Sequence, residues 1–108
     1  AELAFKEFIE LNKEHKLSSN SYYWLGEVYY VTKKYAEAAG AFIDSYKLFP
    51  AGNKAPDSLL KLGMSLAELG STNEACESFE ELLLKFPDAS SRLRRRTLQE
   101  SVRVGCNN

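Results

Sequence analysis

A spaced pattern occurs twice in this chain, 37 residues apart, and it limits the possible folds more than any other feature. Each copy has a Leu-Gly pair, an alanine twelve residues after the glycine, a phenylalanine four residues later and a proline eight residues beyond that. A repeat of this length predicts stacked helical units, because one unit cannot bury its apolar face alone. The repeated residues are Gly26, Ala38, Phe42 and Pro50 in the first copy, and Gly63, Ala75, Phe79 and Pro87 in the second.

Each repeated position has a packing role if a unit consists of two antiparallel helices. A glycine inside a helix costs about 1 kcal/mol relative to alanine, so Gly26 and Gly63 indicate close approach of another helix. The alanines offer small surfaces opposite, and the phenylalanines fill the space between successive pairs. Pro50 and Pro87 end the second helix of each unit, because proline cannot continue a helix interior.

The sequence therefore predicts an all-α domain of about six antiparallel helices. We expect these helices at about 1–15, 20–32, 35–48, 56–70, 72–86 and 89–104. The expected organisation is a single domain, 1–108, in four parts: a truncated repeat (1–17), two full repeats (19–52 and 56–89), and a capping helix with its tail (90–108). The expected N-cap residues are Ser18, Ser19, Asn20 and Ser71, the last in a capping box with Glu74.

These features resemble the tetratricopeptide repeat (TPR), in which a large residue, Leu-Gly and Tyr precede Ala, Phe and a closing Pro. The resemblance covers about residues 1–87. It implies a TPR-type helical-hairpin solenoid with a C-terminal capping helix, and recognition of a peptide or partner helix in a concave groove. The groove positions that it implies are Asn20, Tyr23, Glu27, Tyr30, Asp57, Leu60, Met64, Ala67, Arg94 and Leu98. Alternatively, the last helix or residues preceding the chain cover part of this surface.

The stretch YYWLGEVYY is divided by this register. Tyr22 and Tyr29 are expected in the core, whereas Tyr23 and Tyr30 are expected to be aromatic anchors in the groove. Trp24 is expected against the preceding helix. TPR domains that clamp a chaperone's C-terminal carboxylate carry Lys and Asn at such groove positions, and Glu27 argues against that activity.

Charge and composition argue against several functions. The net charge of −1 provides no overall basic field for nucleic acid or an anionic membrane, and no apolar run approaches the roughly 20 residues of a membrane span. The single histidine, His15, is expected to be solvated, so we expect no catalytic residues, metal site or cofactor. The basic run Arg92–Arg96 favours a solvated helix face over a nucleic-acid patch. A third alternative, ranked between these two, is that this basic run docks against an acidic patch of a partner protein.

The chain has two cysteines, Cys76 and Cys106. A last helix antiparallel to the one before it returns its C-terminal end towards Cys76, which predicts a disulfide between the two residues. This disulfide would place the protein in an oxidising compartment. The alternative is two free thiols, with Cys76 buried and Cys106 in a frayed tail. Residue 1 lies inside a helical pattern, so we expect the chain to be part of a longer protein.

The phrases YWLGEVYY, KAPD, LLKLG and LLLKFPDAS carry a closer resemblance over about residues 18–90. They are similar to the C-terminal TPR domain of the periplasmic Tol–Pal-associated cell division coordinator family (CpoB/YbgF). The resemblance implies a non-enzymatic adaptor that binds Tol–Pal proteins such as TolA, and that coordinates cell-wall synthesis with outer-membrane constriction. It also implies a trimerising coiled coil outside this chain. Lys16 and Lys33 depart from the pattern, because a closing Pro and a turn Gly are common there.

Two other classes remain open. A TPR subunit of an outer-membrane protein assembly lipoprotein complex carries similar YWLG-type repeats. An enzyme with a TPR appendage would need a catalytic domain elsewhere, because this sequence offers no paired acid and base, phosphate loop or metal cluster.

Overall fold

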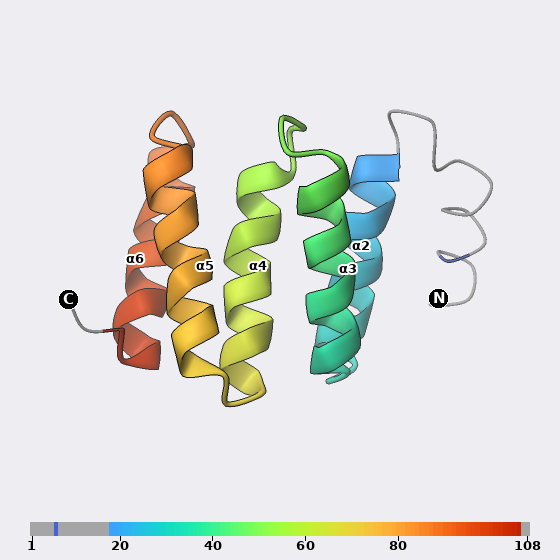
Figure 1. Cartoon of the computed structure of the whole chain (residues 1–108), viewed down its shortest axis with the longest axis horizontal. Helices are drawn as coiled ribbons and strands as arrows, with labels where there is room; N and C mark the ends of the chain where they lie inside the picture. Colours follow the sequence, from blue (N-terminus) through green and yellow to red (C-terminus); the bar gives the residue numbers. More distant parts are fainter. Residues whose placement is uncertain (1–5, 7–17, 107–108) are drawn as a thin grey trace.

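Five helices follow one another in the part of the chain that the computed structural model describes, which is Lys6 and residues 18–106 (Figure 1). They are α2 (Ser18–Val31), α3 (Tyr35–Leu48), α4 (Ala55–Glu68), α5 (Thr72–Lys85) and α6 (Ser91–Val104). The helices expected between 20 and 104 are confirmed to within about two residues at each end, the usual scatter of helix boundaries. The helix expected over 1–15, including His15, lies outside the described residues apart from Lys6.

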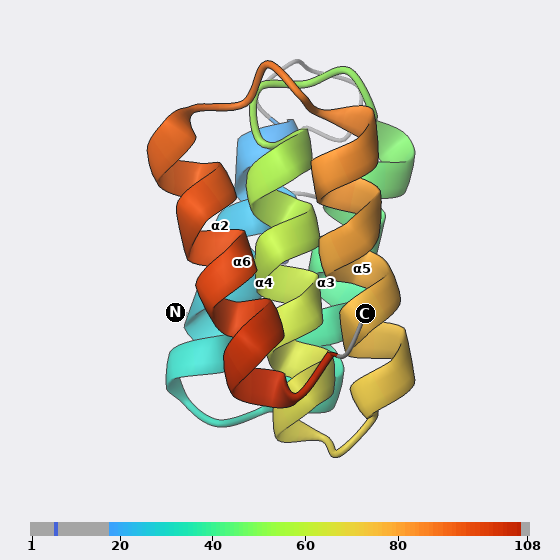
Figure 2. The ribbon, with the colours of Figure 1, turned by 90° about the vertical axis from the view of Figure 1, so that its left-hand side faces the viewer.

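Consecutive helices run antiparallel and form two layers (Figure 2). In this view α2, α4 and α6 lie on one side, and α3 and α5 lie on the other. The hydroxyl of Tyr46 donates to Glu81 Oε2 at 2.8 Å and joins α3 to α5. The first helices of successive hairpins therefore share one face of the solenoid, as the sequence predicts.

The repeated glycines lie directly under the repeated phenylalanines. A Cβ atom added to Gly26 would stand 2.5–2.7 Å from three carbons of the Phe42 ring, and one added to Gly63 would overlap the ring of Phe79 in the same way. Both rings are buried. The glycines are therefore needed for space, which confirms the close approach that the sequence predicts.

The core consists of two clusters, one in each hairpin. The first surrounds Phe42 between α2 and α3, and the second surrounds Phe79 between α4 and α5. The half-buried Tyr30 packs against both clusters and so links the hairpins. Leu93 and Val104 of α6 pack against the second cluster. This helix therefore covers part of the apolar face of the second hairpin.

The turn inside each hairpin is a Schellman motif. After α2, Lys34 N–H donates to Tyr29 O at 2.8 Å and Lys33 N–H donates to Tyr30 O at 3.0 Å. The turn after α4 repeats these bonds, with Gly70 at the place of Lys33. The backbone φ is 81° at Gly70 and 64° at Lys33. Lys33 therefore adopts a left-handed conformation that glycine adopts at lower cost.

The expected capping box at the start of α5 is wrong. Ser71 stands at the N-cap, but its side chain makes no capping hydrogen bond. The backbone of Ser71 is part of the turn after α4, since Ser71 N–H donates to Leu66 O at 2.9 Å. The backbone ψ of Ser71 is 70°, far from the extended value of a capping serine. Ser90, with ψ of 148°, instead caps α6 by accepting from Leu93 N–H. Residues 18–20, also expected as N-caps, lie within α2.

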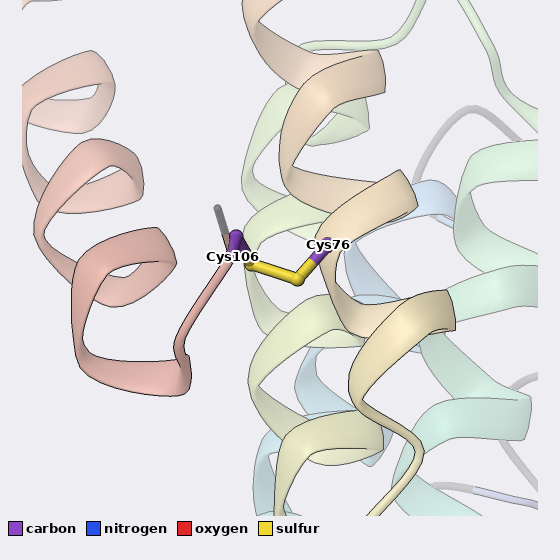
Figure 3. The surroundings of a disulfide bond; sticks show 2 residues. All are labelled: Cys76 and Cys106. Carbon is purple, nitrogen blue, oxygen red and sulfur yellow. A yellow bond between two sulfur atoms is a disulfide. The ribbon is translucent and has the colours of Figure 1, made fainter. Parts of the chain in front are cut away.

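A disulfide joins α5 to the end of α6, as Figure 3 shows. Cys76 and Cys106 have Cα atoms 5.5 Å apart. Gly105, with φ of 91°, ends α6 and turns the chain towards α5 in a third Schellman motif, in which Cys106 N–H donates to Ser101 O at 2.9 Å. The structure therefore contains the disulfide expected from the antiparallel course. Loop-closure entropy over a sequence separation of 30 residues gives it a stabilising effect of about 3–4 kcal/mol.

Replacing the helical glycines tests the close packing. We expect Gly63→Ala to lower the free energy of unfolding by about 1–3 kcal/mol, because the new methyl group must displace the Phe79 ring. The matched control is Gly40→Ala, since nothing lies within 4 Å of a Cβ at Gly40 in α3. This control should raise stability by up to about 1 kcal/mol through helix propensity. Urea denaturation followed by circular dichroism measures both, and equal effects would contradict the packing described.

Replacing Lys33 tests the strain in the first turn. We expect Lys33→Gly to stabilise the fold by about 0.5–1 kcal/mol, because relief of the left-handed strain exceeds the added entropy of the unfolded chain. Gly70→Ala, at the equivalent place in the second hairpin, should destabilise by a similar amount. Thermal unfolding compares the two, and a destabilising Lys33→Gly would show that the turn is not strained.

Candidate functional site

A hollow of about 480 Å³ lies on the face shared by α2, α4 and α6, and we call it the groove. Pockets that hold ligands have volumes of about 300–1,000 Å³, so the groove is large enough for recognition. It is bounded by one residue of α2, by three of α4, and by α6 with its N-cap. The lining residues are Tyr23, Asp57, Leu60, Lys61, Ser90, Arg92, Leu93, Arg95, Arg96 and Gln99.

One exposed face of α6 forms a wall of the groove. Arg92, Arg95, Arg96 and Gln99 follow the spacing that brings residues to one side of a helix. The basic run was expected to be a solvated helix face, and Arg92, Arg95 and Arg96 are exposed in agreement with this, whereas Arg94 is half-buried. The structure adds that this face turns towards α2 and α4, so the arginines border a concave surface rather than a free one.

The groove positions expected on α6 are wrong by one residue. Arg94 donates from Nη1 to the carbonyl oxygens of Leu83 at 3.1 Å and Phe86 at 3.0 Å. It therefore satisfies the C-terminal end of α5, where a cation is favourable. Leu98 lies between α5 and α6, beside the Cys76–Cys106 disulfide. A shift of one residue rotates a side chain by about 100° around the helix, which takes Arg94 out of the groove.

Tyr23 lines the groove but belongs mainly to the core. It is only 5% exposed, and its ring lies 5.6 Å from that of Phe42 and 5.2 Å from that of Trp24. Lys54 Nζ stands 4.9 Å from the ring centre. Burial, reinforced by the carboxylates of Glu27 and Asp57, raises the pKa of Tyr23 well above its usual value. The expectation of a free aromatic anchor at Tyr23 is therefore wrong.

Polar and aromatic contacts connect the groove to neighbouring residues of α2 and α4 on the same face. Lys61 pairs with Glu27 at 3.2 Å, and its Nζ also lies 5.8 Å from the ring centre of Tyr30. Burial raises the pKa of Tyr30 as well. Arg96 Nη2 lies 4.0 Å from the sulfur of Met64. Of the groove residues expected on α2 and α4, Tyr23, Asp57 and Leu60 line the groove, while Glu27, Tyr30 and Met64 adjoin it.

Several other expected residues lie elsewhere. Asn20 is in the first turns of α2, and its Oδ1 is buried without a hydrogen-bond partner in the described structure. Ala67 packs against the second cluster. Tyr29 is buried in the first cluster and Tyr22 is half-buried against it, as expected for core residues. Trp24 is 46% exposed. The helix expected to cover it lies outside the described residues.

A buried carboxylate of α6, Glu100, pairs with two arginines near the groove. Glu100 is 8% exposed and accepts from two residues of its own helix, Arg96 at 3.2 Å and Arg103 at 2.8 Å. Thr97, between these arginines, is completely buried and donates to Leu93 O. These contacts order side chains within α6, while Arg94 and the Cys76–Cys106 disulfide join this helix to α5. The sequence reading missed Glu100 and Thr97, although their spacing on one helix was visible.

Positive charge exceeds negative charge around the groove. Lys61 and Arg96 are paired with Glu27 and Glu100, but Arg92 and Arg95 have no carboxylate within ion-pair distance in the described part of the chain. Asp57 is the one acidic residue among the groove's lining residues. The mouth of the groove is therefore basic, although the whole chain has a net charge of −1.

A second hollow, of about 310 Å³, lies over α4 between α3 and α5. Its floor is apolar, with Leu59, Leu62 and Leu66. Three glutamates of α5 border it, at positions 74, 77 and 81. Burial and the hydrogen bond to Glu81 raise the pKa of Tyr46, on the opposite side, to about 12. The two faces of the solenoid therefore differ in charge, a feature that the sequence reading missed although the glutamate spacing indicates it.

Comparison with known proteins supports the repeat assignment. Residues 57–89, which span α4, α5 and the turn that follows, match the tetratricopeptide repeat family. No curated protein matches the chain. With its all-helical hairpins, the chain has the fold of a TPR-type helical solenoid, and such repeats typically act as non-catalytic modules that bind proteins. Within residues 18–106 no cluster of three potential ligands could hold a metal ion, and no helix is long and apolar enough to span a membrane.

Truncation of Tyr23 tests its place in the core. We expect Tyr23→Ala to lower the free energy of unfolding by about 3–5 kcal/mol, because it removes a buried ring beside Phe42. Val31→Ala on the same helix is the control, since Val31 is 74% exposed and should change stability by no more than about 0.5 kcal/mol. Urea denaturation measures both. If the Tyr23→Ala variant is as stable as the control, Tyr23 is a surface residue and not part of the core.

Proposed function

We propose that this chain is a non-enzymatic scaffold of the bacterial cell envelope that binds a protein partner in the groove between α2, α4 and α6. The observation that carries the proposal is the groove itself, a concave surface with a partly apolar floor, at Leu60 and Leu93, and a fixed polar wall. TPR modules recognise peptides and partner helices on such surfaces.

The particular system that we propose is Tol–Pal. The phrases YWLGEVYY and LLLKFPDAS resemble the periplasmic cell division coordinator family. The first lies in α2, and the second runs from the end of α5 to the N-cap of α6. The partners would be Tol–Pal proteins such as TolA and the cell-wall synthesis machinery. The role would be to coordinate cell-wall synthesis with outer-membrane constriction during division. Oligomerisation would use a coiled coil outside this chain.

The disulfide supports a periplasmic location. A bond between Cys76 and Cys106 persists in oxidising compartments and is rare in the cytosol. It uses both cysteines of the chain and fastens the helix that forms the groove wall. In the oxidising periplasm this disulfide would persist and keep the groove wall in place.

Titration with TolA tests the proposal. The disulfide-bonded chain should bind the purified periplasmic part of TolA in a saturable manner by isothermal titration calorimetry. Gln99→Trp places a large side chain on the groove wall and should weaken this binding by about tenfold or more, because it occupies the partner's space. Asp44→Trp, at an exposed position of α3, is the matched control and should bind normally.

Two results would count against the proposal. If TolA does not bind the wild-type chain, the Tol–Pal assignment is wrong. If Gln99→Trp and Asp44→Trp bind equally well, the groove is not the docking surface.

The second candidate is a TPR subunit of an outer-membrane protein assembly lipoprotein complex, because such subunits carry similar YWLG-type repeats. The full-length gene product distinguishes the two. A cleavable signal peptide followed by heptads supports the cell division coordinator, and a lipobox cysteine supports the assembly lipoprotein.

A further inference from the structure

We infer that the groove recognises an extended acidic segment of its partner, with two carboxylates against the arginines of α6. The inference rests on the proposal that the groove is the docking site, and it adds the chemistry of the segment that binds there. It is carried by the uneven charge of the lining residues and by their spacing along one helix.

The unpaired arginines are placed to receive carboxylates. Arg92 and Arg95 are exposed at the mouth of the groove and have no acidic partner in the described structure. Arg96 stands beside them and shares Glu100 with Arg103. An arginine offers several donors in a planar fork that matches a carboxylate. An acidic ligand would supply the partner that these side chains lack.

The spacing of the arginines fits an extended chain. The two unpaired arginines, Arg92 and Arg95, are separated along the helix by about 4.5 Å at a rise of about 1.5 Å per residue. Arg96, which also pairs with Glu100, lies about 6 Å along the helix from Arg92. In an extended peptide, alternate residues face the same side at about 6.6 Å. Two acidic residues separated by one other residue would therefore reach the α6 wall together. The residue between them faces away from α6, towards α4, where an apolar side chain would cover Leu60.

The wall needs no ordering when a ligand arrives. The bonds of Arg94 to the end of α5, the burial of Thr97 and the Cys76–Cys106 disulfide hold α6 at its start, middle and end. A binding surface that is already fixed loses less conformational entropy on association. The arginines are therefore presented on a rigid backbone, which favours recognition of a short segment.

The negative charges near the groove do not cancel this preference. Glu27 would repel a carboxylate, but it pairs with Lys61 at 3.2 Å. Asp57 lies on α4, across the groove from the arginine wall. The acidic segment is therefore expected along α6, a different place from the α2 positions that a chaperone-clamping TPR domain would use.

A protein segment fits the groove better than single-stranded nucleic acid does. Nucleic-acid grooves combine many cations with exposed aromatic rings on which bases stack. Tyr23 is buried under Lys54 and so offers no free ring face. Four cations and one carboxylate line the groove, which suits a ligand with two or three negative charges.

Fluorescence anisotropy with paired peptides tests the inference. The probe is a short, labelled peptide with blocked ends that contains two glutamates separated by a leucine, and the comparison peptide has glutamines in their place. We expect the acidic peptide to bind about tenfold more tightly than the glutamine peptide. This preference should shrink as salt rises from about 50 mM to about 300 mM, because exposed charges are screened.

Charge-matched variants locate the site. Arg92→Gln combined with Arg95→Gln should weaken binding of the acidic peptide by about tenfold, because two charge-assisted contacts are lost. Lys47→Gln combined with Lys85→Gln removes the same charge from exposed positions on α3 and α5, and should bind as the wild type does. Circular dichroism confirms that both double variants are folded.

Three results would overturn the inference: equal binding of the two peptides, equal loss of binding in the two double variants, or displacement of the acidic peptide by an equal concentration of single-stranded oligothymidine. Failure of the acidic-segment inference can be distinguished from failure of the proposed function. If TolA binds and Gln99→Trp weakens it while the acidic peptide does not bind, the acidic-segment inference alone is wrong.

Discussion

The contact on which the rest of the structure depends is a phenylalanine ring lying on a helical glycine. It occurs once in each described hairpin, at Gly26–Phe42 and Gly63–Phe79. It lets the two helices approach until the ring is buried, and each core cluster forms around that ring. Any side chain at the glycine would push the helices apart. The spacing of the helices, and hence the position of α4 in the groove, follows from the absence of two Cβ atoms.

The last helix has two roles because its sides differ. Its apolar residues Leu93 and Val104 pack against the second core cluster, and Thr97 on the same helix is completely buried. Its basic side borders the groove. A solenoid needs a terminal helix to cover its exposed apolar face, and here the same helix supplies the binding wall. The disulfide at its end fixes α6 against α5, and so holds both its apolar side and its basic side in place.

Most of the fold could be predicted from the sequence, because the repeat places strong and specific signals at fixed intervals. A glycine at the same helical place in both repeats, at Gly26 and Gly63, indicates close packing, and the structure confirms this. The helix ends were predictable for a similar reason, since Pro50 cannot continue a helix interior and Gly70 favours the left-handed conformation that ends one. The antiparallel course of the last two helices placed Cys106 near Cys76, which made the disulfide predictable.

The groove was harder to predict, because its walls depend on rotations that the repeat pattern does not specify. The capping helix lacks the Leu-Gly pair that aligns the groove positions in the other repeats. Its groove positions could therefore not be aligned to a repeat residue, and Arg94 was placed in the groove instead of Arg95. Tyr23 satisfies the groove pattern and still reaches the core, since a tyrosine is long enough to do both. The Ser71 cap failed because the tight turn before it restricts the backbone that a capping side chain needs.

Polar residues buried between neighbouring helices were also missed. Ser58 Oγ donates to Ser45 Oγ at 2.9 Å, and Ser78 Oγ donates to the carbonyl of Leu59 at 2.6 Å. A serine in a helix carries no sign of burial in a single sequence. Its small size and its ability to satisfy a nearby oxygen permit close packing there.

A double-mutant cycle on Gly63 and Phe79 tests the central packing contact most directly. The four proteins are the wild type, Gly63→Ala, Phe79→Leu and the double variant, and the measured quantity is the free energy of unfolding in urea. If the methyl group and the ring compete for the same space, the cost of Gly63→Ala should fall by at least about 1 kcal/mol in the Phe79→Leu background. Additive costs in the two backgrounds would contradict the contact, and with it the spacing of helices that forms the groove.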